Sequence, residues 1–335
     1  MESGGVTVGL ALVLLLIVAA EFVNGWTDAP NAIATVIATR ALTPRVAIVL
    51  ASFLNLAGAL SGTAVATTIG TGIVQAGAVS LLTIGSAMVG IIIWSSIAAY
   101  YGLPTSESHA LVSGLAGATI VTAGPSALIG SGWQKVFTGL LFSTFLGFLG
   151  GLVLMVLLLW LFRGSGPRLV RGLFSRLQVL SAAFMAFSHG SNDAQKFMGP
   201  FALALVLGGV LPEFSIPIWV IVLLASVMGL GTAIGGWRII RTMGFRVTRL
   251  EPIHGFCAET SAATVIELAS RLGIPLSTTH TINTAIMGVG ASRRLSMVRW
   301  GVARTIVGAW IITFPLCAGI AAAVAAALTA IGRVT

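Results

Sequence analysis

Five long apolar stretches constrain the fold of this chain more than any other feature of its sequence. They cover residues 6–23, 46–69, 136–162, 216–236 and 305–331, and Glu21 is the only charged residue in any of them. A helix needs roughly 20 apolar residues to cross the hydrocarbon layer of a membrane, and these stretches reach or approach that length. A membrane β-barrel would instead show alternating segments of about 10 residues. The sequence therefore predicts an all-α polytopic membrane protein embedded in a lipid bilayer.

Fourteen of the sixteen arginines of the chain gather in four clusters. These are Arg40 and Arg45; Arg163, Arg168, Arg171 and Arg176; Arg238, Arg241, Arg246 and Arg249; and Arg293, Arg294, Arg299 and Arg304. The intervening residues 70–80, 123–134 and 211–215 hold no Lys or Arg. Loops rich in these residues stay in the cytoplasm, so we expect the Arg-rich loops there and both termini outside the plasma (inner) membrane. This orientation also explains the net charge of +9, which in a soluble protein would suggest nucleic acid; no nucleic-acid partner is expected.

Two short motifs occur twice along the chain, in the same order. Residues 24–29 (NGWTDA) match residues 189–194 (HGSNDA), and residues 102–109 (GLPTSESH) match residues 273–280 (GIPLSTTH). The arginine clusters give the two halves opposite orientations across the membrane. We therefore interpret the chain as two inverted-topology repeats, residues 1–162 and 178–335, joined by an Arg-rich cytoplasmic linker at 163–177 and forming one transmembrane domain.

The motifs predict the plan of each repeat. We expect an interrupted helix that carries the Asp motif, a spanning helix, a re-entrant helical hairpin with the Gly-x-Pro motif at its tip, and a long final helix. Non-helical backbone at membrane depth is tolerated only where protein or a wet cavity satisfies it. Inverted repeats with such interruptions are typical of transporters that work by alternating access around a site near the membrane midplane.

Asp28 and Asp193 are the only two aspartates, and they occupy equivalent positions in the repeated motif. An ionisable group inside a membrane usually faces a cavity, a partner or an ion. Asn24, Asn31 and Asn192 supply further oxygens near the two carboxylates, a combination that suits Na⁺ or a proton relay. The alternatives are that each Asp pairs with an Arg or caps a helix break, and that Asn24 only bonds helix backbone. We interpret the five residues as coupling-ion ligands, with Na⁺ expected at Asp28 and Asp193.

The two Gly-x-Pro motifs are followed by hydroxyl side chains and by free N–H groups at two helix N-termini. Two such termini that face each other would bind a tetrahedral oxyanion. Ordinary Ser/Thr capping of the two helices is the alternative. The candidate oxyanion ligands are Thr105, Ser106, Ser108, Ser277, Thr278 and Thr279.

Several titratable residues accompany these motifs. His109 and His280 lie one turn into the inner half-helices, where they contact the substrate, move protons or remain neutral and bond backbone. His189 shares a helix face with Asp193. Lys196 lies three residues beyond Asp193, where its ammonium group pairs with the carboxylate or attracts the anion. Either role would replace one cation site. The alternative hypothesis is therefore that the second repeat binds no Na⁺ and that coupling runs partly through protons.

The motifs resemble those of the inorganic phosphate transporter (PiT) family, and of its bacterial low-affinity members in particular. The resemblance rests on residues 24–34, 39–44, 102–110, 188–196 and 273–280 and covers nearly the whole chain. It implies symport of inorganic phosphate with Na⁺ or H⁺, a homodimer, and phosphate held between the two hairpin tips beside the Asp motifs. We expect no cofactor apart from the coupling ion.

Some positions depart from the family pattern. Trp26-Thr27 stands where bacterial members tend to have Phe-His, Pro30 where they have a small residue, and Glu107 where they have Ser. Glu107 beside a phosphate would repel it unless it is protonated or is paired with Lys196 or a metal. The cargo is therefore inorganic phosphate or a metal–phosphate complex, and sulfate is the alternative substrate. Glu259, on the segment that enters the second hairpin, is a further candidate for a proton or charge role.

Two other classes of protein also place charged groups in membrane helices. An intramembrane aspartyl protease would need two carboxylates that share a proton, but it would not need duplicated Ser/Thr hairpin tips. An anion channel would share the tips but would not need the carboxylates. The sequence thus favours a transporter that is not an enzyme.

Overall fold

The computed structural model describes residues 3–332, and within this range the protein is all-helical and has no β-strand. The first half contains α1 (Ser3–Ala38), α2 (Pro44–Ala59), α3 (Ala64–Gly72), α4 (Leu81–Tyr101), α5 (Glu107–Ala123) and α6 (Gly130–Leu161). The second half contains α7 (Pro167–Leu207), α8 (Ile218–Ile234), α9 (Trp237–Arg241), α10 (Pro252–Arg271), α11 (Thr278–Ala291) and α12 (Trp300–Gly332). Short turns lie at η1 (Ala76–Ala78), η2 (Pro125–Ala127), the π-helical η3 (Thr242–Arg246) and η4 (Leu295–Met297).

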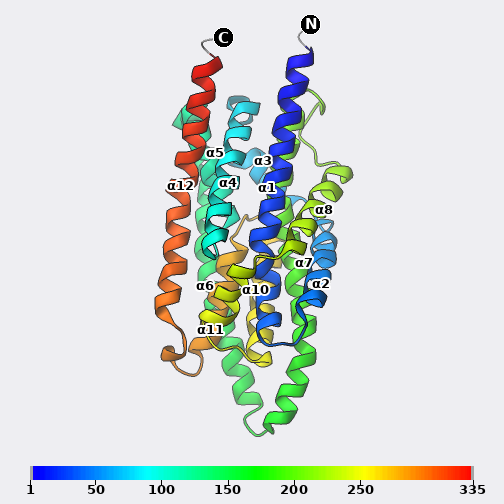
Figure 1. The fold of residues 1–335 in the computed structure, drawn as a ribbon, viewed down its shortest axis with the longest axis vertical. Coiled ribbons are helices and arrows are strands. Elements are labelled where there is room, and N and C mark those ends of the chain that lie inside the picture. Colours follow the sequence, from blue (N-terminus) through cyan, green and yellow to red (C-terminus); the bar gives the residue numbers. More distant parts are fainter. Residues whose placement is uncertain (1–2, 333–335) are drawn as a thin grey trace.

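The same order of elements occurs in both halves: a long helix, a bent pair of helices, a hairpin of two helices and a second long helix. The bent pairs are α2 with α3, at 67°, and α8 with α9 and η3, at 61°. Figure 1 shows that α1 begins at one end of the molecule and α7 at the opposite end. The predicted inverted repeats are therefore present. The division of the chain at residues 162 and 178 stays a prediction, and α7 already begins at Pro167.

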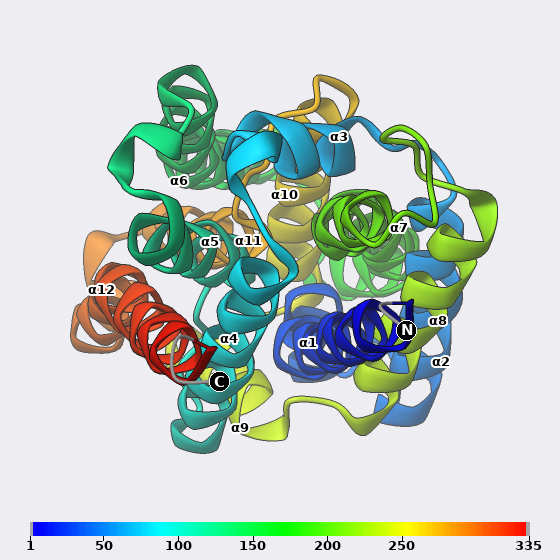
Figure 2. The ribbon, with the colours of Figure 1, turned by 90° about the horizontal axis from the view of Figure 1, so that it is seen from above.

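Five helices, α1, α4, α6, α7 and α12, are long and apolar enough to cross a membrane, and the number of spans rises to seven if each bent pair is one span. Viewed from above, α6 and α12 lie at the periphery of the bundle (Figure 2). Their outer faces expose large apolar side chains such as Leu141 and Ile311, which suit contact with lipid tails. The protein is therefore a multi-pass membrane protein.

The helices that carry the Asp motifs differ from the prediction. Both are continuous: α1 passes unbroken through Asp28 and Pro30, and α7 passes unbroken through Asp193 and Pro200. The interruptions fall instead in the two bent pairs. The physical reason is that Asp193 finds its partners on α7 itself, whereas Asp28 and Asn31 find theirs on the second hairpin tip, so neither motif needs an unwound helix.

The two hairpins enter from opposite ends and their tips lie at mid-height, as predicted (Figure 1). Each tip begins with a glycine in the left-handed conformation, Gly102 at φ 69° and Gly273 at φ 64°. A residue with a Cβ is strained in this conformation, and glycine is the usual residue just beyond a helix C-terminus. Pro104 and Pro275 follow two residues later and prevent the first helix from continuing. The repeated Gly-x-Pro motif is therefore a helix-stop signal.

Each hairpin packs against the long final helix of the other repeat. The most extensive contacts of α6 are with α11, and those of α12 are with α5. Glycines allow this close approach: a Cβ on Gly117 of α5 would lie 2.2 Å from the carbonyl oxygen of Ala318, and one on Gly288 of α11 would lie 2.0 Å from that of Phe148. Small residues serve this purpose in membrane helices generally. The two repeats are thus interleaved.

The apolar core is divided into two clusters. One includes Ile17 of α1 and Phe197 of α7, and the other includes Ile33 of α1 and Met185 of α7. Because both long helices contribute to both clusters, their central turns lie between the clusters. These central turns carry the Asp motifs. The fold therefore places a buried polar layer between two apolar layers.

Candidate functional site

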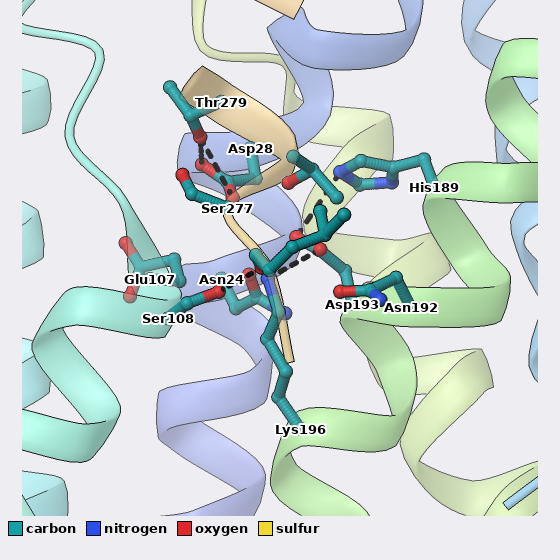
Figure 3. A network of polar contacts seen from close by, with 12 residues as sticks. Asn24, Asp28, Glu107, Ser108, His189, Asn192, Asp193, Lys196, Ser277 and Thr279 are labelled. Atoms are coloured by element: carbon teal, nitrogen blue, oxygen red, sulfur yellow. Dashed lines mark hydrogen bonds and ion pairs between the residues drawn. The ribbon is translucent and has the colours of Figure 1, made fainter. Parts of the chain in front are cut away.

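The second hairpin tip contacts the Asp motif of the first repeat. Asn31 donates from Nδ2 to Thr279 Oγ1 at 2.9 Å and to Thr278 Oγ1 at 3.4 Å. Thr279 Oγ1 in turn lies 3.4 Å from both carboxylate oxygens of Asp28 (Figure 3). All four side chains are buried. Asp28 thus has only weak hydrogen bonds within the described protein, and its oxygens keep capacity to bind a cation.

Asp193 has a different environment. Lys196 Nζ lies 2.5 Å from its Oδ1, and His189 Nε2 lies 3.3 Å from its Oδ2. These three side chains are fully buried on consecutive turns of α7, and His189 Nδ1 also lies 3.2 Å from Asn55 Oδ1. The predicted pairing of Lys196 with Asp193 is what the structure contains. Because both carboxylate oxygens already have nitrogen neighbours, the residues present do not fit a Na⁺ ion bound at Asp193 in the way that they fit one at Asp28.

The two aspartates come together from opposite repeats. Ligand atoms of Asp28, Asp193 and His189 all lie within 4.8 Å of one another. Such a separation would also suit an aspartyl dyad. However, the ammonium group of Lys196 occupies one oxygen of Asp193, whereas a dyad needs both carboxylates to share a proton.

The two hairpin tips are joined directly. Ser108 donates from Oγ to the carbonyl oxygen of Leu276 at 2.7 Å. Ser106 and Ser277 accept from the backbone N–H groups of His109 and His280, at 3.3 and 3.1 Å, so these two hydroxyls cap α5 and α11. Capping of this kind leaves other N–H groups of the first turn without an intrahelical partner.

The helix ends at the tips suit an anion. The free N–H groups belong to the first turns of α5 and α11, which begin at Glu107 and Thr278. Backbone N–H groups and the helix dipole favour negative charge at such ends. Thr105, the last candidate ligand, is buried at the first tip, and its backbone N–H donates to the carbonyl of Leu103 at 3.0 Å.

Glu107 does not pair with Lys196. Its Oε1 accepts from Thr27 Oγ1 and its Oε2 accepts from Ser95 Oγ, both at 2.9 Å, and the side chain is 1% exposed. Lys196, one of the partners considered for Glu107, is held by Asp193 on its own helix. Hydroxyl groups of α1 and α4 stabilise Glu107 instead. Ser95 lies in an apolar helix, where nothing in the sequence singled it out.

The two tip histidines lie against each other and against α12. Their rings are 4.5 Å apart between centroids, and Trp310 stacks on His280 at 3.7 Å. His109 Nδ1 lies 3.2 Å from the backbone oxygen of Trp310, and His280 Nδ1 lies 3.1 Å from Thr144 Oγ1. Trp310 Nε1 donates to the carbonyl of Pro104 at 2.9 Å. Trp310 thus connects both tips, and its place in an apolar helix gave no signal of this role.

Glu259 lies in a separate, fully buried network. Its Oε1 accepts from Thr35 Oγ1 at 2.5 Å and from Gln178 Nε2 at 3.1 Å, and its Oε2 accepts from Ser181 Oγ at 2.5 Å. Gln178 Oε1 accepts from Thr39 Oγ1 at 2.7 Å. Sequence reasoning missed Thr35, Gln178 and Ser181. Thr35 lies one helical turn beyond Asn31, and that spacing could have placed it on the same face.

Several buried oxygens of the site have no hydrogen-bond partner among the described residues. Asn24 donates from Nδ2 to Glu21 Oε2 at 3.0 Å, and Asn192 donates from Nδ2 to Ser270 Oγ at 3.0 Å. The Oδ1 atoms of both asparagines and Glu21 Oε1 are left without a partner in this part of the chain. Asn24 thus bonds a side chain, not helix backbone. Unpaired oxygens in a buried layer are the groups that a cation or water would satisfy.

Comparisons with known proteins agree on one family. Residues 24–321 match the family described as "Phosphate transporter family". A Rhizobium meliloti protein with the name "Probable low-affinity inorganic phosphate transporter" is 45% identical over 317 residues, which is 94% of each chain. A Bacillus subtilis protein of the same name is 39% identical over 322 residues, covering 93% of this chain and 96% of its own. A solved structure, "The sodium-dependent phosphate transporter", superposes with a TM-score of 0.87 at 27% identity and covers 97% of this chain and 100% of its own.

Proposed function

Because this chain belongs to the phosphate transporter family, it is a transporter and not an enzyme, and we propose that it is a secondary active symporter of inorganic phosphate. Uptake is coupled to Na⁺, to H⁺ or to both, and the inverted repeats rock around a site near the midplane of the membrane. One observation carries this proposal above the others. The N-termini of α5 and α11 come from opposite repeats, meet at the bond between Ser108 and Leu276, and lie beside two buried aspartates.

Phosphate binding is assigned to the two hairpin tips. The free N–H groups at the starts of α5 and α11, with the hydroxyl group of Thr278, offer donors to several oxygens of one tetrahedral anion. Ser108 and Thr279 donate to Leu276 and Asp28 and so hold the two tips in place. The direct bond between the tips supports a single shared site, because a ligand held by both repeats responds to their relative movement. Sulfate has the same shape and is the alternative substrate. A metal–phosphate complex is a further form of the cargo.

Coupling is assigned to the buried carboxyl groups. Asp28, Glu21, Glu107 and Glu259 are buried and form no ion pair with any described residue. An isolated carboxylate in the membrane interior is costly, so each must bind a cation or carry a proton. Na⁺ is proposed at Asp28, and the sodium-dependent structural relative supports this choice of ion. At Asp193 the ammonium group of Lys196 takes the place of a cation, so fewer Na⁺ ions are needed and protons supply part of the coupling.

The setting of the transporter is proposed from the sequence. We place it in the plasma (inner) membrane as a homodimer, with the Arg-rich loops in the cytoplasm and both termini outside. The start of α1 and the end of α12 lie at one end of the molecule, and the loop between α6 and α7 lies at the other, which agrees with this orientation (Figure 1). The terminal residues 1–2 and 333–335 themselves lie outside the described part of the chain.

The test is uptake of radiolabelled phosphate into proteoliposomes under separately imposed Na⁺ and H⁺ gradients. We expect uptake to follow at least one gradient and to fall at least about tenfold in Asp28→Asn, because the cation site loses its charge. The matched control is Glu213→Gln, which neutralises an exposed acid. Uptake that ignores both gradients would point to a channel. Uptake of labelled sulfate in preference to phosphate would show that sulfate, not phosphate, is the substrate.

A further inference from the structure

The arginine clusters form a cavity at the end of the molecule where α6 and α7 are joined. Its volume is about 870 Å³, and its walls come from the end of α1, the end of α6, the start of α7, the segment before α10 and the loop between α11 and α12. Six arginines line it: Arg40, Arg163, Arg171, Arg249, Arg293 and Arg299. Every one of the four clusters in the sequence contributes at least one of them. The only acidic residue in the lining is Glu251.

The charge of this cavity is not neutralised by the protein. None of the six arginines forms an ion pair with a described residue; the only arginine that does so in this part of the chain is Arg271, with Glu267. Arg163 lies over the ring of Trp160, 5.5 Å from its centroid. The six side chains are exposed to solvent. The cavity therefore offers guanidinium groups to a ligand without first breaking internal ion pairs.

The general preference for basic residues in cytoplasmic loops does not explain this convergence. That preference concerns the side of the membrane on which a loop lies, not the direction of a side chain. Arg45, Arg246 and Arg294 belong to the same sequence clusters as Arg40, Arg249 and Arg293 but do not line the cavity. One arginine of each of these three pairs thus lines the cavity.

The size and charge of the cavity suit an anion larger than the transported one. Small-molecule sites typically measure about 300–1,000 Å³, and the volume of this cavity lies in that range. One phosphate group carries roughly two negative charges, which is fewer than the six arginines of the lining could neutralise. Guanidinium groups bind phosphoryl oxygens through paired hydrogen bonds. We propose that this cavity is a binding site for an anion with several phosphoryl groups, distinct from the transport site at the hairpin tips.

Such a ligand would act on both repeats at once. Arg40 belongs to the first repeat, whereas Arg249, Arg293 and Arg299 belong to the second. Thr39 also lines the cavity, and its hydroxyl begins the buried chain through Gln178 to Glu259. An anion that bridges the two repeats opposes their relative movement, so its binding in the cavity inhibits transport. The inhibition rests on the proposed function, whereas the binding does not.

The test is calorimetric titration of the full-length protein in detergent with tripolyphosphate as the probe. One triple variant, Arg40→Gln, Arg249→Gln and Arg293→Gln, removes arginines that line the cavity. The matched control, Arg45→Gln, Arg246→Gln and Arg294→Gln, removes the same charge from the same three clusters. We expect the affinity to fall by about tenfold or more in the first variant and to change by less than about threefold in the control, because only the first loses direct charge-assisted hydrogen bonds.

The outcomes separate the possibilities. An equal loss of affinity in both triple variants would overturn the proposal, since net charge alone would then explain binding. Displacement of tripolyphosphate by equimolar orthophosphate would also overturn it, because the cavity would then be a vestibule for the transported anion. In nanodiscs, weaker binding with cardiolipin than with phosphatidylcholine alone would support the site and identify a lipid headgroup as its source of phosphoryl groups. Unchanged binding would support a soluble source.

Discussion

The pair of Lys196 and Asp193 gives the sharpest test of how this site holds its charge. Lys196 stands where the first repeat has Asn31, so Lys196→Asn gives the second repeat the residue that the first has at this position. The change leaves Asp193 fully buried without its ammonium partner at 2.5 Å. Removal of one partner from a buried ion pair costs about 3–5 kcal/mol. If each kcal/mol lowers the Tm by about 2 °C, the variant should unfold at least about 6 °C below the parent protein in Na⁺-free buffer.

Na⁺ should restore much of this loss, because the freed carboxylate becomes able to bind the ion. At a Na⁺ concentration 100 times its Kd, binding returns about 2.7 kcal/mol. The measurement is thermal unfolding in detergent, followed by tryptophan fluorescence, in matched NaCl and choline chloride buffers. The double variant Asp193→Asn and Lys196→Asn should lie close to the parent protein and gain no extra stabilisation from Na⁺, because it removes both charges together.

The control for a general effect of losing a lysine is Lys135→Asn, which changes the other, exposed lysine of the chain. A Tm of Lys196→Asn equal to that of the parent protein in choline chloride would refute the reasoning. So would a loss that Na⁺ leaves unchanged relative to the double variant. In the first case the ion pair would not hold Asp193 in its charged form, and in the second the site would not bind Na⁺.

Three further changes test the contacts between the repeats. Ser108→Ala removes the bond to Leu276 and should weaken phosphate uptake about threefold to tenfold at subsaturating phosphate, because a hydrogen bond of about 1 kcal/mol is lost. An unchanged KM for phosphate would contradict a shared tip site. Trp310→Phe keeps an aromatic ring but removes the donor to Pro104, and should lower stability by about 1 kcal/mol in thermal unfolding, whereas an unchanged Tm would show that this bond contributes nothing. Gly288→Ala puts a Cβ 2.0 Å from a carbonyl oxygen of α6 and should lower the Tm by an amount equivalent to about 1–3 kcal/mol or prevent folding. The control Gly308→Ala, with open space around the glycine, should keep the parent Tm, and equal Tm values for the two variants would contradict the close packing.

The Asp motifs illustrate a limit of sequence reasoning. Polar residues and Pro30 within an apolar stretch predict a broken helix, yet α1 and α7 are continuous through both motifs. Local sequence cannot say whether a buried polar group finds its partner in unwound backbone or in a neighbouring helix. Asn31 finds Thr279 on the opposite repeat, and helix breaks occur in the bent pairs, where no charged residue marked them.

Glu107 illustrates the same limit for a charged group. The sequence left three ways to neutralise it: a proton, Lys196 or a metal. The structure gives it hydroxyl groups of Thr27 and Ser95 instead. The ion pair between Lys196 and Asp193, by contrast, could be predicted, because its two members lie three residues apart on one helix.

From the sequence alone we could predict that the chain lies in a membrane, that it contains two inverted repeats, and which polar residues mark its site. These properties are local or repeated, because hydropathy, helix-stop glycines and duplicated motifs are read along the chain. The folded structure was needed to show how the repeats interleave. It also revealed the bonds from Ser108 to Leu276, from Trp310 to Pro104 and around Glu259. Each of these bonds joins residues far apart in sequence. Their pairing depends on helix packing, which the sequence of any single segment does not specify.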